Sequence, residues 1–271
     1  MNKKVIFIDI DGTLVGHDNG IAKIPQSAID AIRKARQLGH YVYLSTGRSL
    51  AEIYDYILDI GFDGIIGAAG GYIEHCGKVL YHQKLSYEQI KKITDYFNHN
   101  NIYYYLEGND GLYCNHIFLD FLKDIVLLGN YEESDFYHAM KSIDTCSLDS
   151  INKITFMSQS KNYETIFKNF EDEFQIVRAS WLNVIGDAGE ISLKGINKAS
   201  AIKKLMNHLQ IDMKNTVAIG DSMNDKEMFE CCHIAIAMEK AEHGVEKYAD
   251  FITKDIFDDG IEYALKYYKI I

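Results

Sequence analysis

Two carboxylates follow the first apolar run of this sequence. The run Val5-Ile6-Phe7-Ile8 predicts a buried strand, and Asp9-Ile10-Asp11-Gly12-Thr13 comes directly after it. Open α/β sheets bind their ligands beyond the carboxyl ends of the strands. Because two close carboxylates repel each other, both stay ionised only beside a positive charge, and Mg²⁺ prefers such oxygen ligands. One carboxylate could then attack phosphorus while the other moves a proton, whereas an acidic turn that caps a helix is the alternative.

A second acidic turn follows another apolar run, Thr216-Val217-Ala218-Ile219. The turn reads Gly220-Asp221-Ser222-Met223-Asn224-Asp225, and Asp221 or Ser222 can cap a helix that we expect to begin near Asn224. A cap explains one aspartate, but it does not explain the further oxygen-bearing side chains within four residues. Because parallel strands bring their carboxyl ends to one edge of a sheet, the two turns predict one metal site assembled from distant parts of the sequence.

Two further segments offer groups that bind a phosphate. Ser45-Thr46-Gly47-Arg48 follows a short apolar run, and its backbone N–H groups at the start of an expected helix form an anion site. The hydroxyl that binds the anion belongs to Thr46 or to Ser45, since the sequence does not fix which residue leaves the strand first. Arg48 either clamps the phosphate through two hydrogen bonds or lies on the surface.

A lysine near the start of an expected helix points to the same anionic site. Lys198 follows the expected N-cap Asn197. A cation at a helix N-terminus is unfavourable because it opposes the helix dipole, so its presence there needs another explanation. Neutralising an anionic site is one such reason, and simple solvent exposure is the alternative. Lys194 is a second candidate for this role.

The alternation of strands and helices predicts an α/β fold with a doubly wound parallel-sheet (Rossmann-like) core domain and an inserted α+β cap domain. We place the core in residues 1–83 and 190–271 and the cap in residues 84–189. Expected core helices cover residues 25–38, 50–60, 199–209 and a last stretch from 260, and expected core strands cover 41–44, 64–67, 216–219 and 234–236. Expected cap strands cover residues 102–106, 151–157, 174–177 and 182–185, with helices at 87–98 and 163–170.

Aromatic and polar residues of the insert offer weaker indications. Alternate side chains of Tyr103-Tyr104-Tyr105 should face the core of the small domain while the others face solvent, although a substrate-stacking platform is the alternative. His116 and Glu107 could touch a substrate, but nothing in their spacing requires it.

Composition and charge favour a soluble enzyme over a nucleic-acid or membrane protein. The chain has 28 basic and 39 acidic residues, and the net charge of −11 disfavours nucleic acid and anionic membranes as partners. No apolar run approaches the roughly 20 residues that span a bilayer, and the first strand begins too early for a signal peptide. We therefore expect a cytoplasmic protein with no membrane partner.

The two acidic turns and the segments between them resemble the four motifs of the haloacid dehalogenase-like phosphohydrolases, in the expected order. Asp9-x-Asp11-Gly12-Thr13 resembles the first motif, Ser45-Thr46-Gly47-Arg48 the second, Lys198 the third, and Gly220-Asp221-x-x-Asn224-Asp225 the last. The match covers the whole chain, and its long insert resembles the Cof-type branch with a large α/β cap. Many members of that branch carry Asn-Gly where this chain has Gly70-Gly71, so any phosphate contact from that Asn side chain is missing here.

This resemblance implies a catalytic set and a Mg²⁺ cofactor. Asp9 would attack phosphorus and form an aspartyl-phosphate, Asp11 would act as acid and base, and Lys198 would neutralise the anionic groups. Mg²⁺ would be held by the carboxylates of Asp9 and Asp221 and by the backbone carbonyl of Asp11. The implied phosphate-binding residues are Gly12, Thr46 or Ser45, Gly47, Arg48 and Asn224, and Asp225 would orient metal-bound waters or Lys198.

The activity implied by the resemblance is Mg²⁺-dependent hydrolysis of a small phosphorylated metabolite, such as a sugar phosphate, a nucleotide or a cofactor phosphate. The cap would exclude water and choose the leaving group. A phosphosugar mutase on the same fold and a non-catalytic module that binds a phosphate ligand are the alternatives. We expect a monomer or a weak homo-oligomer.

Overall fold

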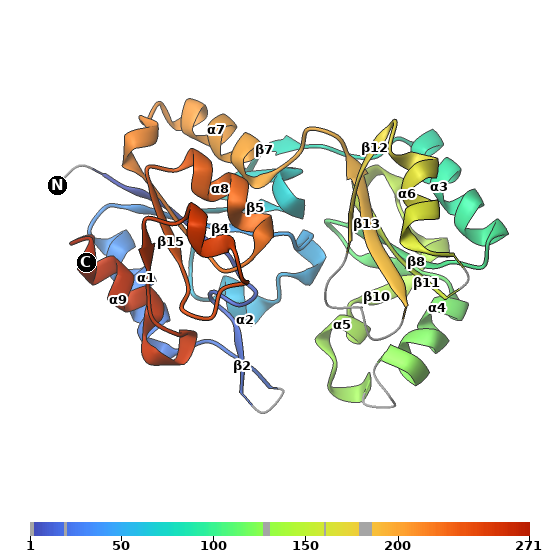
Figure 1. Ribbon diagram of the computed structural model, residues 1–271, viewed down its shortest axis with the longest axis horizontal. Coiled ribbons are helices and arrows are strands. Elements are labelled where there is room, and N and C mark those ends of the chain that lie inside the picture. Colours follow the sequence, from blue (N-terminus) through green and yellow to red (C-terminus); the bar gives the residue numbers. More distant parts are fainter. Residues whose placement is uncertain (1–2, 19–20, 127–130, 160, 179–185) are drawn as a thin grey trace. The chain divides into compact units, whose positions relative to one another are not determined.

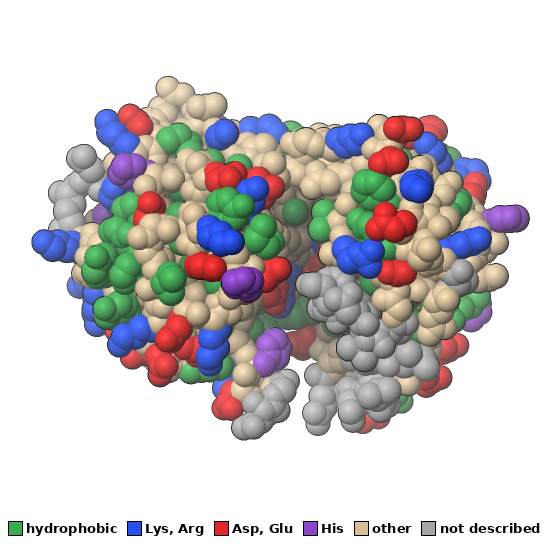
Figure 2. All heavy atoms as spheres, viewed as in Figure 1, with side chains coloured by type: hydrophobic (Ala, Val, Ile, Leu, Met, Phe, Trp, Pro, Cys, Tyr) green, Lys and Arg blue, Asp and Glu red, His purple; other side chains and the backbone are tan. Residues whose placement is uncertain are grey.

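The computed structural model describes residues 3–18, 21–126, 131–159, 161–178 and 186–271 (Figure 1). The chain forms two compact units. The core unit comprises Met1–Gly47, Asp55–His82 and Asn197–Ile271, and the inserted unit comprises Arg48–Tyr54 and Gln83–Ile196. On the face drawn in Figure 2, acidic and basic side chains are interspersed. Within the described parts of the chain, no helix combines the length and the apolar character that a bilayer crossing requires.

An eight-stranded sheet forms the centre of the core unit. Its strands, in spatial order, are β16 (Phe251–Ile252), β15 (Ile234–Ala237), β14 (Thr216–Gly220), β1 (Val5–Ile8), β4 (Tyr41–Ser45), β5 (Gly64–Gly67), β6 (Tyr72–His75) and β7 (Lys78–His82). The strands from β16 to β5 run parallel, and β6 and β7 add an antiparallel edge. A separate hairpin, β2 (Gly16–Asp18) with β3 (Ile21–Lys23), follows the first acidic turn.

Helices cover both faces of this sheet, as expected for a doubly wound fold. On one face α7 (Lys198–Leu209) and α8 (Lys226–Cys231) pack against a cluster that includes Val5 and Phe7 of β1. On the other face α1 (Gln26–Gln37) and α9 (Gly260–Tyr267) lie side by side (Figure 1). Every side chain of β1 is fully buried, which agrees with its unbroken apolar run.

The predicted helix over residues 50–60 is wrong. This stretch forms a 3₁₀ turn, η1 (Leu50–Glu52), and a short helix, α2 (Asp55–Leu58). Ile53 between them has an extended backbone, which interrupts the helix, and its side chain is buried. Ser49 and Glu52 form a reciprocal capping box that closes the single turn.

A six-stranded, mostly antiparallel sheet forms the inserted unit. Its strands, in spatial order, are β10 (Met140–Ser142), β9 (Leu112–Cys114), β8 (Tyr103–Gly108), β11 (Ile151–Ser158), β13 (Asp187–Leu193) and β12 (Phe174–Arg178). The helices α3 (Tyr87–His99) and α6 (Tyr163–Phe170) build the hydrophobic core on one face. The helices α4 (His116–Phe121) and α5 (Asp135–His138) contribute to a second cluster on the other face.

Two expectations about the insert differ from the structure, and a third concerns residues that the structure does not describe. The expected boundary at residues 189 and 190 falls inside β13, which pairs with both β11 and β12, and the two units instead divide between Ile196 and Asn197. The expected strand at residues 182–185 lies outside the described residues. The tyrosines of β8 do not alternate between core and solvent, because Tyr104 is buried on one face and Tyr105 on the other.

Candidate active site

The two acidic turns meet because their strands are neighbours. The strands β1 and β14 pair in parallel, with Ile8 opposite Ile219, so Asp9 and Asp221 follow the ends of two neighbouring strands. The backbone N–H of Asp9 donates a hydrogen bond to the carbonyl oxygen of Ile219 at 3.0 Å. The expected edge of the parallel sheet therefore brings together acids that lie more than 200 residues apart in the sequence.

Two glycines allow the turns to approach each other. Gly12 has a φ of +76°, which L side chains rarely adopt, and a Cβ added there would overlap the carboxylate of Asp221. A Cβ on Gly220 would overlap the carboxylate of Asp225 in the same way. Larger residues at either position would push an acid out of the site, so both glycines are needed for close packing.

Lys198 lies at the centre of the acidic groups. Its Nζ donates hydrogen bonds to Asp9 Oδ1 at 2.6 Å, to Asp225 Oδ1 at 2.6 Å and to Asn224 Oδ1 at 3.1 Å. Burial lowers the pKa of Lys198, but the carboxylates of Asp225 and Asp9 outweigh it and raise the pKa above its usual value. The amine is thus a buried ammonium ion, and the alternative of a solvent-exposed lysine is excluded.

The start of α7 fixes this lysine. The side chain of Asn197 caps the helix by accepting a hydrogen bond from the Ser200 N–H at 2.8 Å, which makes Lys198 the first helical residue. Gly70, with a φ of +105°, packs against the carbonyl of Asn197, where any Cβ would overlap it. Gly70 therefore supports the backbone at Lys198, and this close approach explains a glycine at that position.

Asp225 is a buried hub that joins the lysine to the last acidic turn. Its Oδ2 accepts hydrogen bonds from the backbone N–H of Asp221 at 3.0 Å and of Ser222 at 3.2 Å, while its Oδ1 binds Lys198. Both of its oxygens are thus engaged by protein donors. Sequence reasoning gave this residue a supporting role, and its position between Lys198 and the turn suits that role.

The carboxylates of Asp9, Asp221 and Asp225 form the candidate cation site. They offer ligand atoms that all lie within 4.8 Å of one another. Burial, followed by repulsion from Asp225, raises the pKa of Asp221 to about 7, although the hydroxyl of Thr13 donates to its Oδ1 at 3.1 Å. Burial also raises the pKa of Asp9 well above its usual range, against the opposing effect of Lys198.

A hard cation fits this donor set. The grouped atoms are all carboxylate oxygens, which Mg²⁺ prefers, and a divalent cation would offset the repulsion that raises the two pKa values. Because protein donors occupy both oxygens of Asp225, Asp9 and Asp221 are the better candidates for direct ligands. The side chain of Asp11 is exposed and is not part of this carboxylate group.

The predicted phosphate-binding residues divide between the two units. Ser45, Thr46, Gly47, Gly12 and Asn224 belong to the core unit, whereas Arg48 belongs to the inserted unit. The hydroxyls of Ser45 and Thr46 are both on buried residues, and Ser45 Oγ has no hydrogen-bond partner among the described residues. The choice between Ser45 and Thr46 therefore stays open.

The side of Gly47 where a side chain would stand is open. A Cβ built there would meet only the side-chain nitrogen of Asn224 among the described atoms, 4.0 Å away. The expected anion site at a helix start is wrong in one respect, because a single 3₁₀ turn replaces the helix and contributes little dipole. Arg48 Nη1 donates to the carbonyl of Glu52 at 2.8 Å, and the guanidinium lies over the ring of Tyr54.

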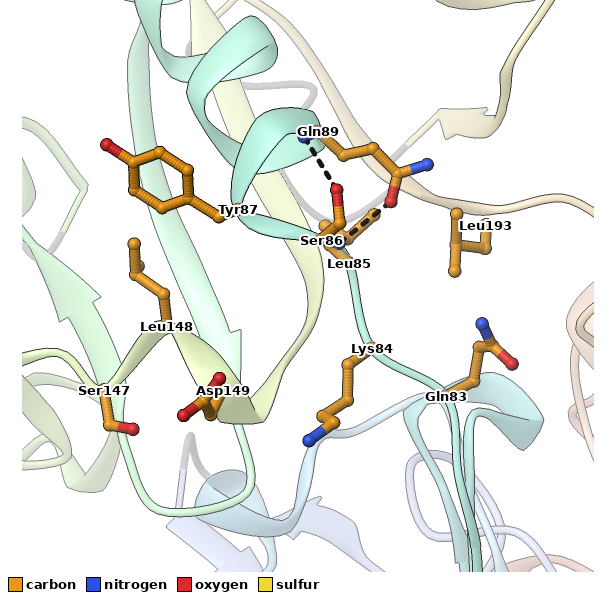
Figure 3. Close-up of a pocket in the computed structure, with 10 residues that line it drawn as sticks. All are labelled: Gln83, Lys84, Leu85, Ser86, Tyr87, Gln89, Ser147, Leu148, Asp149 and Leu193. Atoms are coloured by element: carbon orange, nitrogen blue, oxygen red, sulfur yellow. Dashed lines mark hydrogen bonds between the residues drawn. The ribbon is translucent and has the colours of Figure 1, made fainter.

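A depression of about 790 Å³ lies in the inserted unit, whereas the carboxylates of the candidate cation site belong to the core unit (Figure 3). It is lined by Gln83, Lys84, Leu85, Ser86, Tyr87, Gln89, Ser147, Leu148, Asp149 and Leu193. Ser86 and Gln89 hydrogen-bond each other as the capping box of α3, so their polar atoms already have partners. None of the predicted site residues lines this depression.

Sequence reasoning missed two side chains that contribute to the geometry. Thr13 was part of the first acidic turn but had no assigned role, although its hydroxyl binds Asp221. Glu52 lies inside the helix that the sequence predicts, whereas in the structure its side chain closes the turn that follows Arg48. The signal for Glu52 was the Ser-x-x-Glu spacing from Ser49, which is typical of a capping box.

Comparisons with known proteins identify the family of the chain. The sequence model of a family described as haloacid dehalogenase-like hydrolase matches residues 6–265. YkrA of Bacillus subtilis is 29% identical over 98% of each chain. The phosphoglycolate phosphatase of Methanobrevibacter smithii is 27% identical, again over 98% of each chain. A solved structure of the haloacid dehalogenase subclass IIB sugar phosphatase BT4131 has a TM-score of 0.77 and 25% identity, and the match covers 99% of this chain and 100% of that one.

Proposed function

The chain belongs to the family of haloacid dehalogenase-like hydrolases, of the Cof type, and we propose that it is a Mg²⁺-dependent phosphatase of small phosphorylated metabolites. The observation that carries the proposal is the buried ammonium of Lys198, which binds Asp9 while Asp221 lies beside them. This arrangement keeps a nucleophilic carboxylate next to positive charge at the edge of a parallel sheet. In phosphoryl transfer, positioning of the reacting groups and neutralisation of their charge account for most of the catalysis.

Asp9 is the proposed nucleophile. Burial disfavours its ionised form, and the hydrogen bond from Lys198 opposes that effect. One carboxylate oxygen of Asp9 attacks phosphorus, so an acyl-phosphate bond forms and the bond between phosphorus and the leaving oxygen breaks. Lys198 stays protonated and neutralises charge on the transferring group.

Asp11 is the proposed acid and base. Its side chain is exposed, unlike that of Asp9, so a substrate oxygen or a water can reach it. It gives a proton to the leaving alkoxide in the first step. It then takes a proton from a water that attacks the aspartyl-phosphate, which releases inorganic phosphate and restores Asp9.

Mg²⁺ would be held by the carboxylates of Asp9 and Asp221, with the backbone carbonyl of Asp11 as a further ligand. When bound, this cation supplies positive charge to the phosphoryl oxygens. The residues that orient the site are Thr13, which binds Asp221, and Asp225, which binds Lys198 and the last turn. Thr46 or Ser45, Gly47 and Asn224 would contact the phosphate.

The inserted unit is proposed to select the leaving group. Support comes from the chain itself, since Arg48–Tyr54 belongs to that unit and follows Gly47 directly in sequence. The relatives differ in the substrates that their names state, such as phosphoglycolate for the Methanobrevibacter smithii protein. We propose that the substrate is a small phosphate monoester.

Release of inorganic phosphate from a panel of phosphorylated sugars, nucleotides and cofactors tests the function. The wild-type chain should release phosphate in the presence of Mg²⁺. This activity should stop when EDTA is added and return when Mg²⁺ is restored. Asp9→Asn should lower turnover by at least ~10³-fold with an unchanged circular dichroism spectrum. Asp30→Asn, an exposed aspartate on α1, is the matched control and should keep full activity. Full activity in EDTA, or an active Asp9→Asn variant, would contradict the proposal.

A further inference from the structure

A charged cluster lies buried in the sheet of the inserted unit, outside the proposed catalytic set. Glu107 of β8 stands opposite Lys153 of β11, and both side chains are nearly inaccessible. Lys153 Nζ lies 3.1 Å from Glu107 Oε2 and 2.8 Å from Glu190 Oε2. The hydroxyl of Thr155 donates to the other oxygen of Glu107. Buried charges of this kind are costly, so a physical reason for them is needed.

Glu52 connects this cluster to the turn that follows the candidate phosphate segment. Its Oε2 accepts hydrogen bonds from the N–H of Ser49 at 3.0 Å and from the hydroxyl of Ser49 at 2.9 Å. Its backbone carbonyl accepts the hydrogen bond from Arg48 Nη1. The turn η1 packs against β8, the strand that carries Glu107, and the charge of the Glu52 carboxylate raises the pKa of Glu107. Glu52 therefore holds the turn on one side and meets the buried cluster on the other.

The neighbouring side chain Ala51 strengthens this attachment. It packs against the hydrophobic cluster that Tyr105 and Leu112 form on the same face of the sheet. The turn at Leu50–Glu52 is thus held to the inserted unit by an apolar contact and by a polar one. Only two residues, Arg48 and Ser49, separate this turn from Gly47.

Two neighbouring carboxyl groups can share one proton, and Glu107 has the surroundings that favour this. Burial, and next the charge of Glu52, raise the pKa of Glu107 well above its usual range, while Lys153 opposes them. Glu107 Oε2 has no hydrogen-bond donor of suitable geometry among the described residues. A proton kept by Glu107 would turn an oxygen into a donor toward Glu52, which removes a carboxylate charge from the cluster.

We propose that Glu52 is a positioning residue for the phosphate-binding segment Ser45-Thr46-Gly47-Arg48, and that Glu107 and Lys153 hold it in place. This inference rests on the proposed phosphatase function. Glu52 touches no reacting atom in the proposal. It fixes Ser49 and Arg48, which directly follow Gly47 in the sequence, so this end of the segment is ordered before substrate arrives. Pre-organisation of this kind strengthens phosphate binding because less ordering remains to be done on binding.

The test measures phosphate binding and catalysis in Glu52→Ala and Glu52→Gln variants of the full chain. The alanine lacks both the Ser49 and the Glu107 contacts, so KM for p-nitrophenyl phosphate and the inhibition constant of inorganic phosphate should rise about tenfold. The kcat should change less than about threefold, since no group that reacts has been removed. The glutamine can accept from Ser49 and donate to Glu107, so it should restore both constants to within about threefold of wild type.

Two further variants separate positioning from folding and test the shared proton. Glu171→Ala removes an exposed glutamate of the same unit and should leave every constant unchanged. Glu107→Gln mimics a protonated carboxyl group, since an amide also offers one donor side and one acceptor side, and it should keep near-wild-type phosphate inhibition. The melting temperature of Glu52→Ala should stay within about 2 °C of wild type, because Glu52 is only partly buried.

The outcomes are distinguishable. If the wild-type chain hydrolyses p-nitrophenyl phosphate and Glu52→Ala shows unchanged KM and phosphate inhibition, the positioning role fails while the proposed function stands. If the alanine and glutamine variants both have lower activity and a lower melting temperature than wild type, the role of Glu52 is structural and the inference is overturned. If the wild-type chain does not hydrolyse phosphate esters, and calorimetry detects no binding of inorganic phosphate in the presence of Mg²⁺, the proposed function and this inference fail together.

Discussion

Replacing Lys198 by methionine removes the one ammonium that reaches both buried acids of the described site. Methionine keeps an unbranched chain of similar length, so the change is mainly one of charge. In the structure the lysine makes three hydrogen bonds, two of them to buried carboxylates at 2.6 Å. Without it, Asp9 and Asp225 repel each other and lose their ion-pair partner among the described residues.

The size of the effect follows from burial. Removing one partner of a buried ion pair typically costs about 3–5 kcal/mol of folding free energy, and proton uptake by Asp9 or Asp225 would reduce that cost. We therefore expect Lys198→Met to lower the free energy of unfolding by about 3 kcal/mol in the absence of metal. Activity should fall at least ~10²-fold in kcat, as for the loss of one group that stabilises transition-state charge.

The assay combines urea unfolding followed by circular dichroism, without metal, with phosphate release at saturating Mg²⁺. Lys203→Met is the matched control, because Lys203 is an exposed lysine on the same helix. It should retain wild-type activity and stability within about 0.5 kcal/mol. A Lys198→Met variant with more than a tenth of wild-type kcat would refute the assigned catalytic role. A variant as stable as the control would refute the argument from buried charge.

Two further predictions concern the acidic turns. Burial and Asp225 raise the pKa of Asp221 to about 7, so protonation of Asp221 stabilises the metal-free fold; this contribution is complete below the pKa of the unfolded chain, near 4, and is lost as the pH rises through about 7. Because the same proton competes with Mg²⁺, the dissociation constant of Mg²⁺ measured by calorimetry should fall between about pH 6 and 8. A dissociation constant that does not change over this range would contradict the prediction. Gly12→Ala should lower the free energy of unfolding by about 1–2 kcal/mol through backbone strain, and it should weaken Mg²⁺ binding because the new Cβ overlaps the Asp221 carboxylate. Gly77→Ala is the control, because Gly77 has the same φ of +76° but open space around it. This control should lower the melting temperature in the same way and leave Mg²⁺ binding unchanged.

The parallel sheet of the core unit could be predicted from sequence because its signals are local. Each of the apolar runs at Val5, Tyr41, Gly64 and Thr216 is short and followed by a turn, and each forms a strand. The helix at Leu50 could not be predicted correctly, because the burial of Ile53 is a tertiary effect that overrides a helical pattern. The extent of β13 was missed for a related reason, since its residues gain strand geometry from pairing on both sides.

The candidate site shows the same division between local and long-range information. Sequence spacing places Asp9 and Asp221 at strand ends, but it contains nothing about which strands are neighbours, and it is the pairing of β1 with β14 that joins them. The burial of Lys198 depends on Asn197, Gly70 and the sheet together, so its charge state could not be read from its own helix. Asp225 illustrates the consequence, since a carboxylate with both oxygens bound to protein donors acts on the reaction through Lys198 and the last acidic turn. A pattern of acids therefore predicts that a site exists, whereas the role of each acid follows from which of its oxygens the fold has already engaged.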